Sequence, residues 1–90
     1  MERIWYLYIL RCRDGSLYTG ITNDVSKRLE AHRTGKGAKY TRGRGPLELA
    51  YQEECGSHSD ALKREAQVKS LSRQKKLELV QSVQNNVVNF

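Results

Sequence analysis

The chain has 90 residues, which is enough for one domain and too few for a second core. It is 38% hydrophobic and 29% charged, with seven glycines and one proline, a globular composition that excludes collagen-like and low-complexity proteins. The longest apolar run, residues 4–10, is too short to span a bilayer and no cleavage site follows it. We therefore expect a cytoplasmic protein that does not insert into membranes.

Two other features of the composition concern metals and nucleic acids. Cys12 and Cys55 lack C-x-x-C spacing, which argues against a zinc site and a disulfide framework and predicts two reduced thiols. The net charge is +6, and most of it lies in residues 24–45, where seven cations face two acids, 7 − 2 = +5. Such a segment suits a polyanion, but charge alone leaves a solvated basic face equally open.

The first two elements form a predicted β-hairpin. Residues 4–10 are aromatic and β-branched, residues 13–16 carry a turn signal, and residues 17–22 return as the second strand. We expect Tyr8 to pair with Tyr18, and Tyr6 with Gly20. The apolar face then pairs Trp5 with Ile21, Leu7 with Thr19 and Ile9 with Leu17. Directly opposed Cβ atoms lie roughly 4.5–5.5 Å apart, so the paired tyrosines would touch.

A helix and a basic loop come next. Asn23 is a good N-cap, and the helix should run to about Arg33, before Gly35. The face expected to pack on the sheet holds two apolar and two polar residues (Val25, Leu29, Arg28 and His32), which helix propensity does not explain. Residues 35–46 follow as a glycine-rich basic loop.

The remaining elements are a strand and two helices. Residues 47–55 predict a third strand with Leu47, Leu49 and Tyr51 on one face. Ser57 and Asp60 resemble a capping box for a helix over 58–71. There Glu65 would lie at the centre of the inward face, surrounded by Ala61, Leu62, Val68 and Lys69. Ser72 should cap a last helix with Leu77, Val80 and Val83 inward.

The predicted architecture is a single α+β domain of residues 1–83. Its order is β-β-α-β-α-α, a three-stranded antiparallel sheet flanked by helices. Residues 84–90 are polar and rich in asparagine, and we expect a frayed tail there.

The motifs of the chain resemble those of the GIY-YIG nuclease domain. The first appears as Tyr6-Leu7-Tyr8 and the second as Tyr18-Thr19-Gly20, and the resemblance covers residues 4 to about 80. Arg28, His32 and Glu65 stand at matching spacings. The chain is most similar to small, stand-alone bacterial members. Two departures are Tyr6, which replaces the motif glycine and would narrow the approach to the site, and the lack of a clear counterpart to a late asparagine.

The resemblance implies a role for each site residue. Glu65 would hold one divalent cation, Mg²⁺ or Mn²⁺. Tyr8 would take a proton from water, Tyr18 would position the water or the phosphate, and Arg28 would lower the pKa of Tyr8 and stabilise phosphate oxygens. His32 would hydrogen-bond a tyrosine or relay its proton. Phosphate contacts would come from Lys27, Lys36, Lys39, Arg42 and Arg44.

The function expected from the resemblance is metal-dependent endonucleolytic hydrolysis of DNA, in repair or processing of unusual structures. RNA stays open as a substrate, and a monomer or weak dimer is expected, with specificity drawn from DNA shape or from a protein partner. The alternative is a non-catalytic nucleic-acid-binding module. Each residue also has a simpler interpretation: an aromatic pair for the tyrosines, solvent-facing positions for Arg28 and His32, and a helix ion pair for Glu65 and Lys69.

Overall fold

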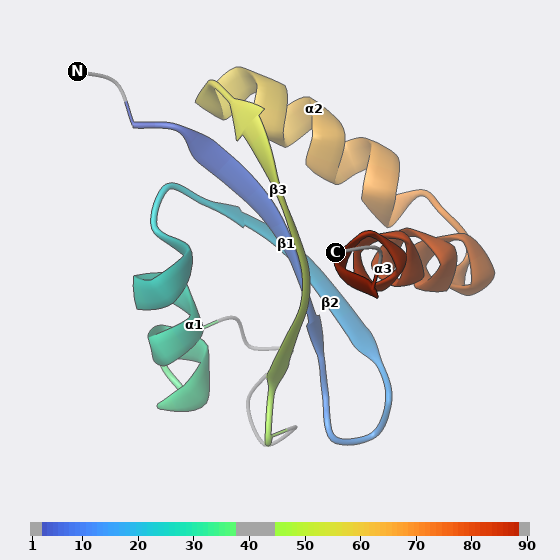
Figure 1. Ribbon diagram of the computed structural model, residues 1–90. Coiled ribbons are helices and arrows are strands. Elements are labelled where there is room, and N and C mark those ends of the chain that lie inside the picture. The colour runs from blue at the N-terminus through green and yellow to red at the C-terminus, as the bar shows by residue number, and fades with distance from the viewer. Residues whose placement is uncertain (1–2, 38–44, 89–90) are drawn as a thin grey trace.

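The computed structural model of the chain describes residues 3–37 and 45–88, the side chains of residues 83–88 excepted. A three-stranded antiparallel sheet lies between one helix on one face and two on the other (Figure 1). The elements are β1 (Trp5–Arg11), β2 (Leu17–Thr22), α1 (Val25–Arg33), β3 (Glu48–Gly56), α2 (His58–Lys69) and α3 (Arg73–Val88). The expected α+β class and the order β-β-α-β-α-α are confirmed.

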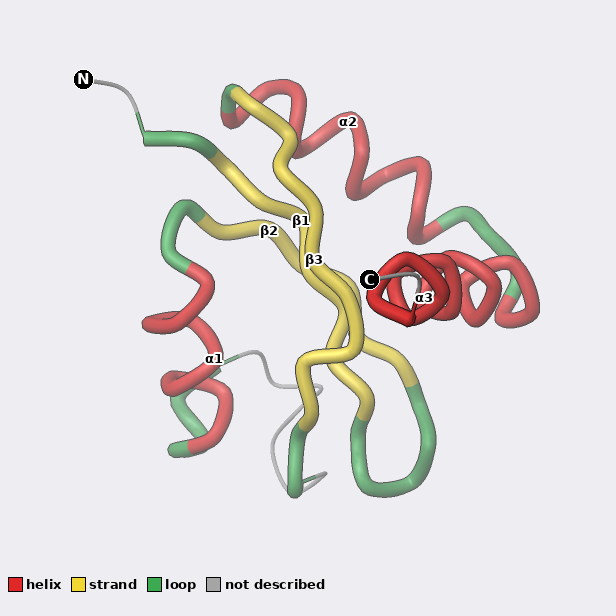
Figure 2. The backbone as a smooth tube through the Cα atoms, in the orientation of Figure 1, coloured by secondary structure: helices red, strands yellow, loops and turns green. Residues whose placement is uncertain are grey.

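The strand order β2-β1-β3 places the most apolar strand in the middle of the sheet. Figure 2 shows the strands running through the centre of the molecule, with α1 on one side and α2 and α3 on the other. Because β1 is covered on both faces, its burial is nearly continuous from Leu7 to Leu10. β2 is left as an edge strand. No helix in the described part of the chain is long and apolar enough to cross a membrane.

The register of the β1–β2 hairpin differs from the expected one by two residues. Tyr8 pairs with Gly20, and Leu10 pairs with Tyr18. A shift of two keeps every side chain on its predicted face, because side chains alternate with period two, so the hydrophobic pattern could not distinguish the two registers. Space decides between them: a Cβ at Gly20 would lie 2.6 Å from Tyr8 Oη. The glycine lies under a tyrosine ring as expected, but that tyrosine is Tyr8 rather than Tyr6.

A β-bulge corrects the prediction for the third strand. Ile9 pairs with Tyr51 and Leu10 with Leu49, which leaves Ala50 as an extra residue on β3. Leu49 and Tyr51 therefore lie on opposite faces of the sheet, and the expectation that they share a face was wrong. Side chains of β3 point to alternate faces of the sheet only where its residues pair one to one with those of β1.

The helix caps agree with the sequence patterns, with two adjustments. Asp24, one residue after the expected Asn23, is the N-cap of α1 and accepts a hydrogen bond from the Lys27 backbone. Ser57 caps α2 as expected. α2 ends at Lys69, because the next residue, Ser70, already serves as its C-cap.

Two predictions about the later helices need correction. Leu62 is 46% exposed, and Lys69 is exposed too, so the inward face of α2 is narrower than expected and centres on Ala61 and Val68. α3 continues to Val88 and so includes residues 84–88 of the segment expected to fray. That segment has no glycine or proline to end the helix. The domain boundary at residue 83 stays a prediction.

The core has one cluster on each face of the sheet. The cluster under α2 and α3 consists of Leu7, Ile9, Tyr51, Val68 and Val80. The cluster on the α1 face consists of Tyr8, Leu10, Cys12 and Leu47, with Tyr18, Leu29 and Leu49 packed against it. The two tyrosines that take part in the buried clusters, Tyr8 and Tyr51, thus lie on opposite faces of the sheet.

Candidate active site

The hydroxyl of Tyr8 is the centre of a buried polar cluster on the α1 face. Tyr8 Oη lies 2.9 Å from His32 Nε2, and Arg28 Nε donates to the same oxygen at 3.4 Å. An arginine can only donate, so Tyr8 Oη accepts from Arg28, whereas the direction of the Tyr8–His32 hydrogen bond depends on the His32 tautomer. We call this group the Tyr8 cluster: Tyr8, Arg28 and His32.

The Tyr8 cluster explains the polar face of α1. Arg28 and His32 are one turn apart and lie over the phenol, while Leu29 packs against the apolar residues beside it. His32 is 2% exposed, and Gly37 lies directly against its ring, because a Cβ at Gly37 would collide with His32 Nδ1. The solvent-facing interpretation of His32 is therefore wrong. Helix α1 can place these two polar side chains against the sheet because the Tyr8 hydroxyl forms hydrogen bonds with both.

Burial sets the protonation of the cluster. Burial raises the pKa of Tyr8 above 10, despite the opposing effect of the Arg28 hydrogen bond. Arg28 lowers the pKa of Tyr8 as expected, but burial outweighs this effect and the net pKa is raised. Burial and the nearby Arg28 charge lower the pKa of His32, and the hydrogen bond to Tyr8 raises that of Arg28. At neutral pH the phenol and imidazole are neutral and the guanidinium is charged.

Tyr18 lies diagonally from Tyr8, in the same ring group. The ring centroids of Tyr8 and Tyr18 are 6.3 Å apart, and Tyr18 contacts the His32 ring edge-to-face at 5.3 Å. The expected contact between the tyrosines is present, although they are not directly opposed in the sheet. The aromatic-pair interpretation describes this geometry correctly but omits the hydrogen bonds of Tyr8.

Glu65 lies on α2, on the other side of the sheet from α1. Its carboxylate forms an i,i+4 ion pair with Lys69 at 3.4 Å, and its side chain is 21% exposed against 53% for Lys69. Its negative charge contributes, as the smallest of several causes, to raising the pKa of Tyr8. In the described residues, no three His, Cys, Asp or Glu side chains gather to hold a metal.

A single partly exposed carboxylate nevertheless fits one kind of metal site. Mg²⁺ keeps several waters and is commonly held by one or two carboxylates together with substrate phosphates. Glu65 can supply such a ligand once Lys69 moves aside, since an exposed i,i+4 pair is worth only about 0.3–0.5 kcal/mol. The residues present therefore fit a hard divalent cation whose other ligands come from water and substrate.

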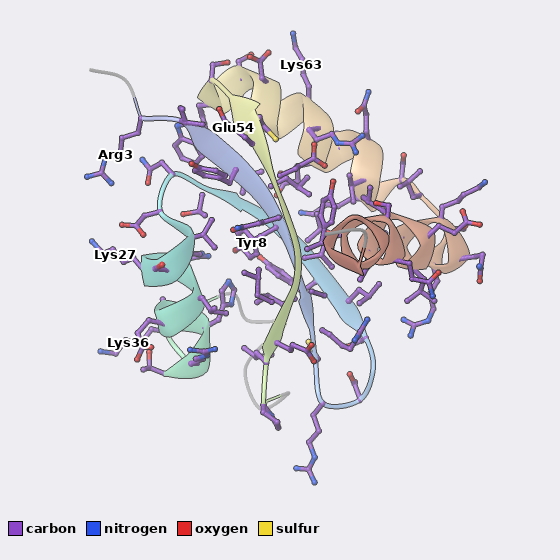
Figure 3. All side chains as sticks on the ribbon, in the orientation of Figure 1. Arg3, Tyr8, Lys27, Lys36, Glu54 and Lys63 are labelled. Atoms are coloured by element: carbon purple, nitrogen blue, oxygen red, sulfur yellow. The ribbon has the colours of Figure 1, made fainter. Side chains whose placement is uncertain are left out.

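The predicted phosphate-binding residues divide into two groups. Lys27 and Arg28 line a cleft of about 270 Å³ together with Arg3 and Asp24, and Lys36 is exposed just after α1. Figure 3 shows Lys27 and Lys36 extending outward from α1. Lys39, Arg42 and Arg44 lie outside the described residues. Tyr6 lines a second cleft with Gln52 and the first turn of α1, and this cleft shares Asn23 and Asp24 with the cleft that Arg28 lines.

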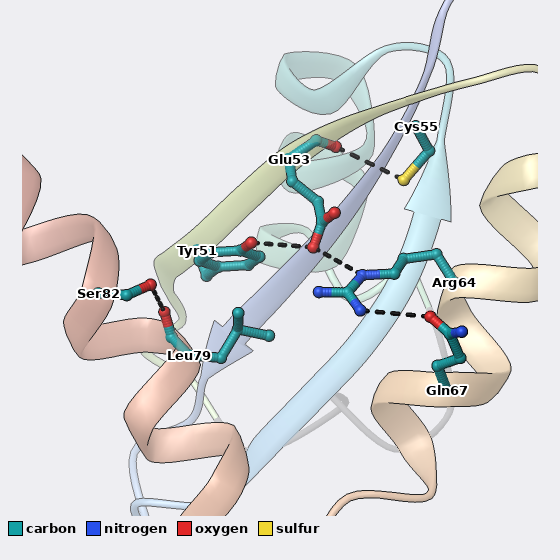
Figure 4. Close-up of polar contacts among 7 residues, drawn as sticks. All are labelled: Tyr51, Glu53, Cys55, Arg64, Gln67, Leu79 and Ser82. Carbon is teal, nitrogen blue, oxygen red and sulfur yellow. Dashed lines mark hydrogen bonds and ion pairs between the residues drawn. The ribbon is translucent and has the colours of Figure 1, made fainter.

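A second polar cluster was not found from the sequence. Tyr51 Oη donates to Glu53 Oε1 at 2.9 Å, and Arg64 Nε donates to the same oxygen at 3.0 Å (Figure 4). Arg64 also donates to Gln67 on the next turn. We call this group the Tyr51 cluster: Tyr51, Glu53 and Arg64. Tyr51 and Glu53 are two apart on one strand, a weak signal, and Arg64 gave no sign of pairing with them.

Comparison with known proteins places the chain in a family. The model of the GIY-YIG catalytic domain matches residues 4–78. The chain is 55% identical to a UPF0213 protein of Staphylococcus saprophyticus, over 83% of this chain and 92% of that protein. It is 53% identical to a UPF0213 protein of Oceanobacillus iheyensis, over 90% and 94% respectively.

Two solved structures are also similar. The solution structure of a UPF0213 protein from Bacillus halodurans has a TM-score of 0.57 and 52% identity, with 87% of this chain and 83% of that one covered. The solution structure of a protein from E. faecalis has a TM-score of 0.63 and 36% identity, with 92% and 88% covered. Motif residues, fold and these matches agree, and the chain belongs to the GIY-YIG catalytic domain family, a family of nucleases.

Proposed function

We propose that this chain is a metal-dependent endonuclease that hydrolyses phosphodiester bonds in DNA. The observation that carries the proposal is the Tyr8 hydroxyl held between a neutral imidazole and a charged guanidinium. A phenol in this setting can pass a proton on without first ionising. Hydrophobic packing alone does not favour this arrangement, because it places three polar groups in a small core.

The proposed proton transfer uses the His32 tautomer whose Nε2 is unprotonated and accepts from the Tyr8 hydroxyl. Attack of water on phosphorus forms one P–O bond and breaks the ester P–O bond on the other side, and the leaving ester oxygen takes a proton from solvent water. The water proton moves to Tyr8 Oη while the phenol proton moves to His32 Nε2, so no free phenolate is required. Arg28 remains hydrogen-bonded to Tyr8 Oη and stabilises the negative charge of the phosphate.

Glu65 would hold the metal, Mg²⁺ or Mn²⁺. When bound, such an ion supplies Lewis-acid polarisation of a phosphoryl oxygen. Glu65 provides one carboxylate within electrostatic range of Tyr8, and Lys69 neutralises it when no metal is bound. The ion pair keeps the carboxylate from remaining an unpaired, partly buried charge.

The basic residues support a nucleic-acid substrate. Lys27 and Lys36 lie exposed on or next to α1, beside Arg28, and the predicted contacts Lys39, Arg42 and Arg44 follow in the chain. A domain of this size reads backbone and shape rather than sequence. We therefore propose branched or otherwise unusual DNA as substrate, in repair or processing, by a cytoplasmic monomer or weak dimer with specificity partly supplied by a protein partner.

A second candidate is a nucleic-acid-binding module without catalysis. The Glu65–Lys69 ion pair favours it, because a carboxylate already paired with lysine needs no metal. The two proposals share the basic surface and differ in what Glu65 does. Position 65 therefore separates them.

The test is metal-dependent cleavage by purified wild type, Glu65→Gln and Glu78→Gln. Glu78 is a matched control, since it pairs with Lys75 on α3 at 3.6 Å and is exposed. Supercoiled plasmid and branched DNA are incubated with Mg²⁺ or Mn²⁺. We expect wild type and Glu78→Gln to cut and Glu65→Gln to bind without cutting. Absence of cutting by the wild type at micromolar concentration would overturn the enzyme in favour of the binding module.

A further inference from the structure

Two basic clefts lie at opposite ends of the edge strand β2. The first, of about 270 Å³, is lined at the end of β2 by Thr22 and by Arg3, Lys27 and Arg28. The second, of about 230 Å³, is lined at the start of β2 by Leu17 to Thr19, and by Lys69 and Lys76 from the helices of the other face. We call them the α1 cleft and the α3 cleft.

Each of the two clefts is lined by a residue that belongs to the Tyr8 cluster or contacts it. Arg28 both donates to Tyr8 Oη and lines the α1 cleft. Tyr18, whose ring contacts His32, lines the α3 cleft. Gly20, between the two ends of β2, has no side chain, and the Tyr8 hydroxyl lies against it. The proposed reacting oxygen is thus situated between the clefts.

The charge of both clefts suits phosphate. The α1 cleft carries three cations and one acid, and that acid, Asp24, already accepts a hydrogen bond from the Lys27 backbone as the helix cap. The α3 cleft carries two lysines and no acid among its lining residues. Its Lys69 is the partner of Glu65, so this cleft also adjoins the proposed metal ligand.

The spacing of the clefts suits a chain rather than a single phosphate. A strand rises about 3.4 Å per residue, so the ends of the six-residue β2 are roughly 17 Å apart. In B-form DNA the phosphates of one strand advance by about 3.4 Å along the axis and lie farther apart along the strand itself, so that distance corresponds to at most about five nucleotides. One phosphate cannot reach both clefts.

We propose that one nucleic-acid strand lies along β2, with the phosphates on one side of the scissile bond in the α1 cleft and those on the other side in the α3 cleft. This inference rests on the proposed function and specifies its substrate: a strand that continues for several nucleotides in both directions. Arg3 in the α1 cleft and Lys69 and Lys76 in the α3 cleft are then phosphate-binding residues. Cleavage close to a strand end leaves one cleft empty and is disfavoured.

Binding tests this proposal without any cleavage. Fluorescence anisotropy measures the affinity of a labelled 20-nucleotide single strand for wild type, Lys27→Ala, Lys76→Ala and the double variant, without divalent metal, from low to moderate salt. Lys63→Ala is the matched control, because that lysine is exposed on the outer side of α2 (Figure 3). Circular dichroism checks the fold of each variant.

The expected result is a smaller salt dependence for each cleft. Loss of one phosphate contact should reduce the slope of log K against log salt by roughly 0.7, the double variant by about twice that, and Lys63→Ala not at all. Shortening the strand to four nucleotides should abolish the effect of one of the two variants, because a short strand cannot occupy both clefts.

The outcomes distinguish this inference from the proposed function. If the wild type binds the strand and Lys76→Ala has the affinity and salt slope of Lys63→Ala, the track through the α3 cleft is overturned, while an endonuclease remains possible. Equal affinity of all variants for the four- and 20-nucleotide strands would overturn it too. The plasmid-cleavage assay with Glu65→Gln tests the proposed function alone, and its result does not change how these binding measurements are interpreted.

Discussion

The Tyr8 cluster and the Tyr51 cluster have similar members and opposite surroundings. Each has a tyrosine hydroxyl beside an arginine Nε, and burial raises the pKa of both tyrosines. In the Tyr51 cluster a carboxylate oxygen receives both donors, at 2.9 and 3.0 Å. In the Tyr8 cluster the phenol oxygen itself accepts from the arginine, and an imidazole nitrogen lies 2.9 Å from it. In the Tyr51 cluster a carboxylate neutralises the arginine, whereas in the Tyr8 cluster an imidazole nitrogen is present that can accept a proton.

The two clusters differ in whether a carboxylate neutralises the arginine charge. The guanidinium of Arg64 is neutralised by Glu53, which lies on β3 and ties it to α2. Arg28 forms no ion pair with a carboxylate within residues 3–37 and 45–88, and it lines a cleft. Its charge is therefore available to an incoming anion. We interpret the Tyr51 cluster as structural and the Tyr8 cluster as functional.

Exchanging the arginines for alanine gives the largest contrast. Arg28→Ala removes the cation next to the phosphate, and cleavage should fall by about 10²–10³-fold with little loss of stability. Arg64→Ala should retain near-wild-type cleavage and lose about 1 kcal/mol of stability, because the Glu53 pair is partly exposed. Single-turnover cleavage and urea unfolding measure the two effects. Equal loss of cleavage in both variants would erase the distinction.

Gly20→Ala tests the space that the Tyr8 cluster needs. The new Cβ would lie 2.6 Å from Tyr8 Oη and 2.7 Å from Cζ, so the ring must move. We expect a stability loss of about 1–3 kcal/mol and a cleavage loss of about 100-fold. A Tyr8→Leu/Gly20→Ala double variant should regain stability relative to Gly20→Ala and stay inactive. Full activity of Gly20→Ala would show that the ring position is unimportant.

His32 makes the Tyr8 cluster sensitive to acid. Its pKa is lowered in the folded chain, so below about pH 6.5 the unfolded chain binds a proton more readily and stability falls as pH falls. Cleavage should decline only when the pH falls below the lowered pKa of folded His32, because protonated His32 cannot accept the phenol proton. Unfolding between pH 7 and 5 should depend less on pH in His32→Gln than in wild type. His58→Gln, which removes the other histidine, is the control.

The Tyr51 cluster gives the smallest effect. Burial and the Glu53 carboxylate raise the pKa of Tyr51 to about 12. Tyr51→Phe should therefore leave the phenolate absorbance unchanged up to about pH 11, whereas Glu53→Gln should increase it by lowering that pKa. A drop in phenolate signal for Tyr51→Phe near pH 10 would mean that this hydroxyl is not held by Glu53.

The sequence predicted the elements well because local signals define them. Ser57 and Ser72 cap their helices, and the apolar run at Leu7 to Leu10 forms the buried central strand. Two features of the sheet, the register of the hairpin and the bulge in β3, could not be predicted from the sequence. A two-residue shift in the hairpin preserves the hydrophobic pattern, and only the fit of Tyr8 over Gly20 selects the register. The bulge at Ala50 likewise depends on contacts between strands.

The candidate site was accessible only through the joint spacing of its motif residues. The sequence brought Tyr8, Tyr18, Arg28 and His32 together, as the structure does. It could not give the direction of the Tyr8 pKa, because burial outweighs the arginine only once packing is known. The Tyr51 cluster gave only a weak signal in the sequence, since Arg64 meets Glu53 through the packing of α2 on β3.

The most direct test compares Tyr8→Phe with Tyr51→Phe. Each substitution removes one buried hydroxyl and keeps the ring, so the two should have similar small effects on stability. Single-turnover plasmid cleavage with Mn²⁺ is measured at a temperature where circular dichroism shows both variants folded. The account predicts that Tyr8→Phe loses at least about 100-fold in rate while Tyr51→Phe stays within about threefold of wild type. Equal rates for the two variants would contradict it.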